Sequence, residues 1–115
     1  MGVILTTINP IQFGRPLSQN QIICLALLAQ RKTRKEIAYA LGVKPSTVYS
    51  RFRGMHETVY VFAPSDWDAQ MVAWTIANSR KLANYVTALK IQHHTNPHLT
   101  QRQLWLDSGL ELIKD

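Results

Sequence analysis

The chain has 115 residues, of which 46% are hydrophobic and 17% are charged. This balance excludes a disordered tail. A membrane-spanning helix is also excluded, because no stretch approaches the roughly 18 consecutive apolar residues that it needs. The apolar start Met1–Ile8 lacks the positive leader of a secretory signal, and the single cysteine, Cys24, cannot form an intramolecular disulfide. We therefore expect a folded cytoplasmic protein without membrane contact.

The formal net charge of +6 is unevenly distributed along the chain. Residues 17–58 contain seven Lys or Arg and two Glu, which gives 7 − 2 = +5, whereas residues 59–115 contain five basic and five acidic residues, which cancel. A charge concentrated in one half of a chain indicates a polyanionic partner for that half.

The first 30 residues predict an arm followed by a helix. Residues 1–16 contain two prolines and two glycines and show no helical periodicity, so we expect an N-terminal arm or a short extended segment, either free or packed on the body. A helix is predicted over Ser18–Gln30, because Ser18 and Gln21 form a capping-box pattern and apolar residues follow at helical spacing.

Two shorter helices are predicted next. Thr33–Leu41 also opens with a capping-box pattern, with Glu36 at the third position, and Gly42 stands where a left-handed residue commonly ends a helix. Pro45 suits the first turn of a following helix. The predicted inner face of that helix carries Val48, Phe52 and Met55, and its outer face carries Thr47, Tyr49, Ser50, Arg51 and Arg53.

The second half of the chain predicts further helices. Residues 59–64 are apolar and β-prone and end in proline, which is typical of a linker over the core or of a helix extension. Asp66–His93 predicts one long amphipathic helix, or two helices broken near Asn78–Ser79. Thr100 with Gln103 predicts the start of a last helix that carries Leu104, Leu106, Leu110 and Ile113.

We therefore expect an all-α fold in which a helix-turn-helix core of three or four helices is followed by a long amphipathic helix and a C-terminal helix. The predicted parts are an N-terminal arm (1–16), a helix-turn-helix DNA-binding domain (17–58), a linker (59–65) and a helical extension (66–115).

Residues 17–55 resemble the helix-turn-helix of LuxR/GerE-type regulators. The residues that match the family pattern in one register are Leu17, Ser18, Gln21, Leu25, Leu27, Leu28, Ala29, Thr33, Lys35, Glu36, Ile37, Ala38, Leu41, Val43, Thr47 and Val48. The chain departs from the pattern at Arg31, where the family usually has glycine, at Lys44, where it has a serine cap, and at Arg51, where histidine is common. The string from Thr47 to Arg53 is also similar to the DNA-reading helix of region four in sigma factors.

The resemblance implies a bacterial-type transcriptional regulator, from a bacterium, phage or plasmid, that binds double-stranded DNA. Arg53 is suited to guanine, and hydroxyls near a helix start are suited to phosphates. The predicted base-contacting residues are Tyr49, Ser50 and Arg53, and the predicted phosphate-contacting residues are Arg34, Lys35, Lys44, Ser46, Thr47 and Arg51.

Two interpretations of the extension stay open from sequence. Its apolar stripe either enlarges a single core or forms the pairing surface of a homodimer, since helix-turn-helix proteins commonly bind two half-sites as dimers. The predicted dimerisation residues are Trp67, Met71, Trp74, Leu82, Tyr85 and Leu89. In the dimer interpretation, Asn78 on this stripe could set the register of pairing.

Other function classes have little support. His93, His94 and His98 lack cysteine or carboxylate neighbours at ligand spacing, so we predict no metal site. No phosphate-binding glycine loop, no nucleophile elbow and no pair of acids on a plausible cleft is present, so we predict neither an enzyme nor a cofactor. Two alternatives to independent DNA binding remain. One is a protein-interaction adaptor or anti-activator on the same fold, and the other is a promoter-recognition factor that works with RNA polymerase.

Overall fold

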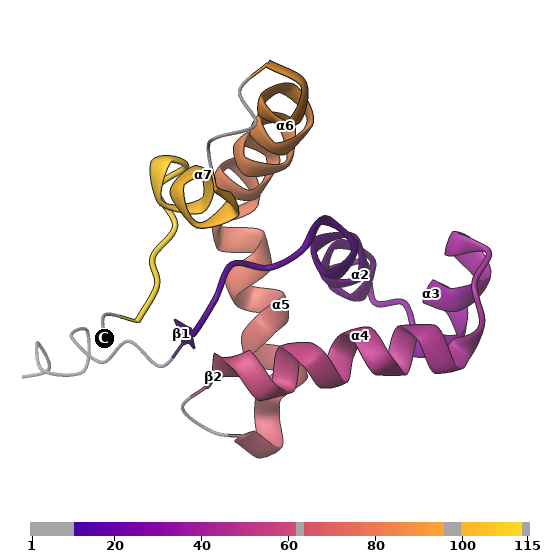
Figure 1. Cartoon of the computed structure of the whole chain (residues 1–115). Helices are drawn as coiled ribbons and strands as arrows, with labels where there is room; N and C mark the ends of the chain where they lie inside the picture. The colour runs from indigo at the N-terminus through magenta and orange to yellow at the C-terminus, as the bar shows by residue number, and fades with distance from the viewer. Residues whose placement is uncertain (1–10, 62–63, 96–99, 114–115) are drawn as a thin grey trace, which may run out of the picture.

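The computed structural model describes residues 11–61, 64–95 and 100–113, and it is mostly helical with little strand, which confirms the all-α class. In chain order the elements are β1 (Gln12–Phe13), α2 (Gln19–Ala29), α3 (Arg34–Leu41), α4 (Pro45–Thr58), β2 (Val59–Tyr60), the short 3-10 turn η1 (Pro64–Asp66), α5 (Trp67–Ala77), α6 (Ser79–Thr95) and α7 (Gln101–Asp107). Figure 1 shows α2 near the centre, α4 below it, α3 at one end of α4, and α6 and α7 at the opposite side of the molecule.

The predicted capping boxes at the starts of α2 and α3 are confirmed. The Ser18 hydroxyl accepts a hydrogen bond from the Gln21 backbone N–H at 3.1 Å, and the Gln21 side chain accepts one from the Ser18 N–H at 2.9 Å. Thr33 and Glu36 repeat this exchange at 3.1 and 2.9 Å. The bond from the Thr33 N–H is the main cause that lowers the pKa of Glu36. Both helix starts are therefore determined by local sequence.

Three helices end in the same left-handed conformation. Gly42 and Gly109 have φ of 68° and 89°, as glycine allows, and Arg31 adopts φ of 67° after α2. At this end the Arg31 N–H donates to the Leu28 carbonyl at 2.9 Å, and the Lys32 N–H donates to the Leu27 carbonyl at 3.2 Å. These two bonds form the motif that usually ends on glycine. The α2–α3 turn is thus closed without glycine, at a backbone cost of about 1 kcal/mol.

One hydrophobic core includes all the predicted parts of the chain. Phe13, from the arm, packs with its ring centroid 4.6 Å from that of Trp74 and 5.3 Å from that of Trp105. The buried Tyr85 hydroxyl donates to the Leu17 carbonyl at 3.1 Å, which links α6 to the start of α2. The arm and the extension therefore share a core with α2–α4.

The predicted linker is partly a strand. Val59–Tyr60 pairs antiparallel with Gln12–Phe13, and the Gly14 N–H donates to the Thr58 carbonyl at 2.8 Å. Val59 is buried, so the β-prone residues after α4 form a ladder with the arm and also fill the core.

The helix boundaries in the second half were predicted in part. The break near Asn78 is confirmed, because α5 ends at Ala77 and α6 begins at Ser79. The prediction that the last helix carries Leu110 and Ile113 is wrong: α7 ends at Asp107, Leu110 is buried after it, and the Ile113 N–H donates to the Phe13 carbonyl at 2.8 Å. Gly109 with its positive φ stops the helix.

Two further details describe the start and the outer side of the last helix. The Thr100 hydroxyl accepts from the Gln103 N–H as expected, but the Gln103 side chain donates to Asp107 and does not return to Thr100. Leu106 is 40% exposed and lies on the outer side of α7. Among the described residues, no helix is long and apolar enough to cross a membrane.

Candidate nucleic-acid interface

The helix α4 has a buried inner face and an exposed outer face. Val48, Phe52 and Met55 are buried, as the helical spacing predicted, so this side of α4 packs into the molecule. On the other side, Tyr49 is 51% exposed, and Ser50 and Arg53 are exposed. The three residues that we predicted to contact bases therefore all lie in solvent on one helix.

The predicted phosphate-contacting residues divide by exposure. Lys35, Lys44 and Ser46 are exposed, whereas Thr47 and Arg51 are half-buried. Lys44 precedes α4 and makes no capping hydrogen bond with its side chain, which leaves that cation in solvent.

No carboxylate interrupts this part of the chain. The sequence has no Asp or Glu between Glu36 and Glu57, so the first three turns of α4 carry cations and hydroxyls and no carboxylate. The resulting surface favours a polyanion by electrostatics.

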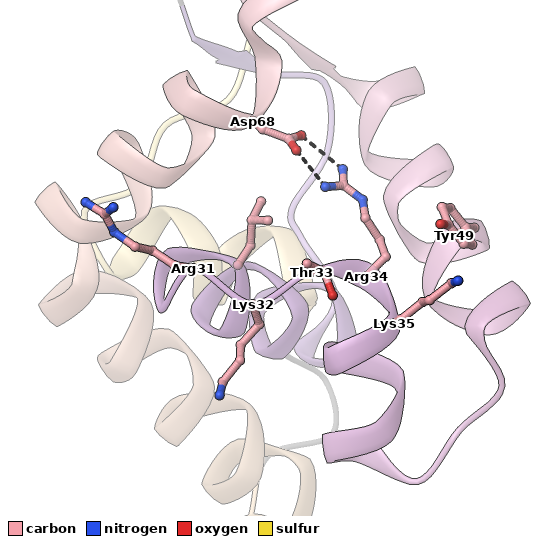
Figure 2. A pocket seen from close by; sticks show the side chains of 8 residues that line it. Arg31, Lys32, Thr33, Arg34, Lys35, Tyr49 and Asp68 are labelled. Carbon is pink, nitrogen blue, oxygen red and sulfur yellow. Dashed lines mark hydrogen bonds and ion pairs between the residues drawn. The ribbon is translucent and has the colours of Figure 1, made fainter.

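Arg34 does not fit the phosphate role that we predicted for it. Its guanidinium donates two hydrogen bonds to Asp68, at 2.6 and 3.0 Å (Figure 2). It also lies 4.2 Å from the centroid of the Phe52 ring. The bond to Asp68 raises the pKa of Arg34, and the bond from Arg34 lowers the pKa of Asp68. Arg34 thus joins α3 to α4 and α5 through an ion pair and a cation–π contact.

The start of α5 also stacks on α4. The rings of His56 and Trp67 lie nearly parallel, with centroids 4.0 Å apart, and Phe52 meets Trp67 edge-on at 6.2 Å. Burial in this stack lowers the pKa of His56. Together with the pair between Arg34 and Asp68, the stack holds α4 against both of its neighbours.

The sequence did not reveal this cluster. Asp68 was not among the predicted site residues, and it lies 34 positions from Arg34. An ion pair at that separation has no local signal. The alternation of basic and aromatic residues in α3 and α4 is equally typical of a DNA-binding face, so it could not identify Arg34 as a structural residue.

The predicted dimerisation stripe is used within the chain. Four of its side chains are buried in the core, and the other two are half-buried and packed against it, which corrects their assignment as a free pairing surface. The buried ones are Trp67, Met71, Leu82 and Tyr85, and the half-buried ones are Trp74 and Leu89. The apolar stripe therefore enlarges the core, as the other interpretation expected. Asn78 is also occupied locally, since its side-chain amide donates to the Trp74 carbonyl at 2.9 Å.

A shallow hollow lies beside the outer face of α4. It has a volume of about 540 Å³ and is bounded by the α2–α3 turn, the start of α3, and single residues from α4 and α5. Its polar lining consists of Arg31, Lys32, Thr33, Arg34, Lys35, Tyr49 and Asp68. Sequence analysis had noted Arg31 as a departure from the family pattern and had assigned neither Arg31 nor Lys32 to the DNA contacts.

In the described part of the chain, no group of three His, Cys, Asp or Glu side chains could hold a metal ion. The side chains of His93, His94 and His98 lie outside the described residues.

No protein-family model, curated protein or solved structure matches this chain. The resemblance to LuxR/GerE-type regulators and to sigma region four therefore stays a prediction from sequence, and the functional argument relies on the surface itself.

Proposed function

We propose that this protein binds double-stranded DNA in a sequence-specific manner and acts as a cytoplasmic transcriptional regulator, with α3 and α4 as a helix-turn-helix. The observation that carries the proposal is the outer face of α4, where Tyr49, Ser50 and Arg53 are exposed. The same helix buries Val48 and Phe52, so it presents a fixed polar face and not a mobile one.

The chemistry of this face suits the major groove. An arginine can donate two hydrogen bonds to guanine, and a good bidentate contact discriminates against other bases by about 1–3 kcal/mol. Arg53 supplies that group, with Tyr49 and Ser50 one helical turn earlier. Lys35, Lys44 and Ser46 are also exposed and supply phosphate contacts. These contacts set the orientation of the protein on the duplex and its affinity for DNA of any sequence.

The first test is selection of a randomised duplex library by the purified full chain at near-physiological salt. An enriched motif supports direct sequence-specific binding. An inverted repeat in that motif indicates that two copies bind together, through a surface other than the buried stripe. Absence of enrichment contradicts independent DNA reading and favours an adaptor. Enrichment that appears only when RNA polymerase is added favours the promoter-recognition alternative.

Two variants separate base reading from backbone contact. Arg53→Ala is expected to weaken binding to the selected duplex and to relax the base preference at one position. Lys35→Ala is expected to weaken binding to all duplexes about equally and to reduce the slope of log K against log salt by roughly 0.9. Lys90→Ala is the matched control, because Lys90 is exposed on α6, away from α3 and α4 in Figure 1. If Arg53→Ala and Lys35→Ala both bind as the wild type does, α4 is not the reading helix.

A further inference from the structure

Three cationic side chains line the hollow beside α4 in addition to Arg34, which is paired with Asp68. Arg31, Lys32 and Lys35 are all exposed, and in the described part of the chain none of them forms an ion pair. Asp68 is the acidic residue in the lining, and its carboxylate is already bound by both guanidinium nitrogens of Arg34. The hollow therefore presents an excess of about three positive charges to solvent.

The three cations do not converge on one point. Figure 2 shows Lys35 extending toward Tyr49 on one side of Thr33, whereas Arg31 and Lys32 extend away on the other side. A small anion needs donors that meet around it, and this arrangement does not provide them. Cations spread along an open hollow instead suit a chain of charges, such as the phosphates of one nucleic-acid strand.

Arg31 strengthens this interpretation. Its backbone has φ of 67°, which glycine adopts without strain, and the Arg31 and Lys32 N–H groups close the turn in the way that glycine normally does. The backbone geometry therefore gives no reason for a long cationic side chain at this position. Because the Arg31 side chain is exposed, its guanidinium is available to a ligand outside the chain.

We infer that the hollow lined by Arg31, Lys32 and Lys35 holds the sugar-phosphate backbone of the DNA strand beside the groove that α4 reads. Tyr49 lies at the border between the two surfaces, because it lines the hollow and is exposed on α4. The inference rests on the proposed function. It adds Arg31 and Lys32 to the phosphate contacts and removes Arg34 from them.

The test measures the salt dependence of binding to the selected duplex for Arg31→Gly, Lys32→Gln and the double variant. Arg31→Gly removes the side chain and keeps the turn, since glycine accepts the positive φ. Each single substitution is expected to reduce the slope of log K against log salt by roughly 0.9, and the two together by roughly 1.8, with the base preference unchanged. Lys90→Gln is the control and is expected to leave the slope unchanged.

The outcomes separate this inference from the proposed function. If the wild type binds the duplex and the double variant keeps its slope, the hollow does not hold the backbone and the inference is wrong. The same holds if Lys90→Gln changes the slope as much as Arg31→Gly does. If the wild type binds no duplex, the proposed function itself fails, and the inference fails with it.

A second measurement tests the competing ligand, a small phosphate. Thermal unfolding of the full chain without DNA is followed as inorganic phosphate is added, with sodium chloride at matched ionic strength as the reference. No specific stabilisation is expected. Stabilisation that the double variant abolishes would identify a small-anion site and would overturn the assignment to a nucleic-acid strand.

Discussion

Replacing Asp68 by asparagine tests whether the start of α5 holds α3 and α4 in place. Asparagine has nearly the same shape as aspartate, but it carries no charge and accepts through one oxygen only. Arg34 then loses one of its two hydrogen bonds and its ionic partner, while it keeps its contact with the Phe52 ring.

The size of the effect follows from geometry and exposure. Hydrogen bonds to charged groups contribute about 1.5–3 kcal/mol, whereas exposed ion pairs contribute about 0.2–1 kcal/mol. The Arg34 side chain is only 22% exposed, but that of Asp68 is 50% exposed, so solvent screens the pair substantially. We expect Asp68→Asn to lower the free energy of unfolding by about 1 kcal/mol, which corresponds to roughly 3–6 °C in Tm for a chain of this length.

The assay is urea unfolding at pH 7 of the wild type, Asp68→Asn, Arg34→Gln and the double variant. Arg34→Gln is expected to be more destabilised than Asp68→Asn, because it also loses the cation–π contact with Phe52. The double-variant cycle is expected to give a coupling energy of about 1 kcal/mol between the two positions.

The pH dependence of the free energy of unfolding is a second test of the ion pair between Arg34 and Asp68. Arg34 holds the pKa of Asp68 below its ordinary value, so the stabilisation is complete above the ordinary carboxyl range and is lost as the pH falls through the lowered pKa. The difference between the wild type and Asp68→Asn should therefore disappear in acid. A coupling energy within about 0.3 kcal/mol of zero at pH 7 would refute the reasoning.

Three other predictions follow from single features. Arg31 and Gly42 both have a positive φ, so Arg31→Gly is expected to raise the free energy of unfolding by up to about 1 kcal/mol. Gly42→Ala is expected to lower it by about that amount through backbone strain alone, because the added methyl group meets no atom within 4 Å. Thermal unfolding checks both predictions. Burial lowers the pKa of His56, so protonation favours the unfolded chain and stability should fall as the pH drops below about 6.5; urea unfolding at pH 7.5 and 5.5 should show a smaller decline for His56→Gln. Phe13→Ala should destabilise the fold by about 3–5 kcal/mol in the same assay, and a loss below about 1 kcal/mol would mean that the arm is not part of the core.

Local sequence was enough to predict the helix starts and the buried face of α4. Capping boxes act within four residues, and the spacing of Val48, Phe52 and Met55 reports the helical period directly. The same local rules explain why Gly42 was correctly placed in a left-handed conformation. Where one residue type satisfies a nearby backbone group, the sequence is sufficient.

Features that depend on distant partners were missed. The strand Val59–Tyr60 forms because the arm lies beside it, and the arm is more than 40 residues earlier in the chain. Arg34 looks like any exposed cation until Asp68 is placed opposite it. The aromatic stripe of α5 and α6 has the same period whether it faces a partner or its own core, so only the packing decides between them.

The distribution of the core makes a last prediction about domain boundaries. Residues 17–58 were predicted to be a separate domain, but α2 packs directly on α5, and the Leu17 carbonyl at its start is bonded by Tyr85 from α6. A fragment of residues 1–60 would expose the side of α2 that packs on α5. We expect it to show no cooperative thermal transition by circular dichroism, whereas the full chain does. If the fragment unfolds cooperatively, α2–α4 fold without the second half, and the contacts of Arg34 and Tyr85 serve to position that half and not to complete the core.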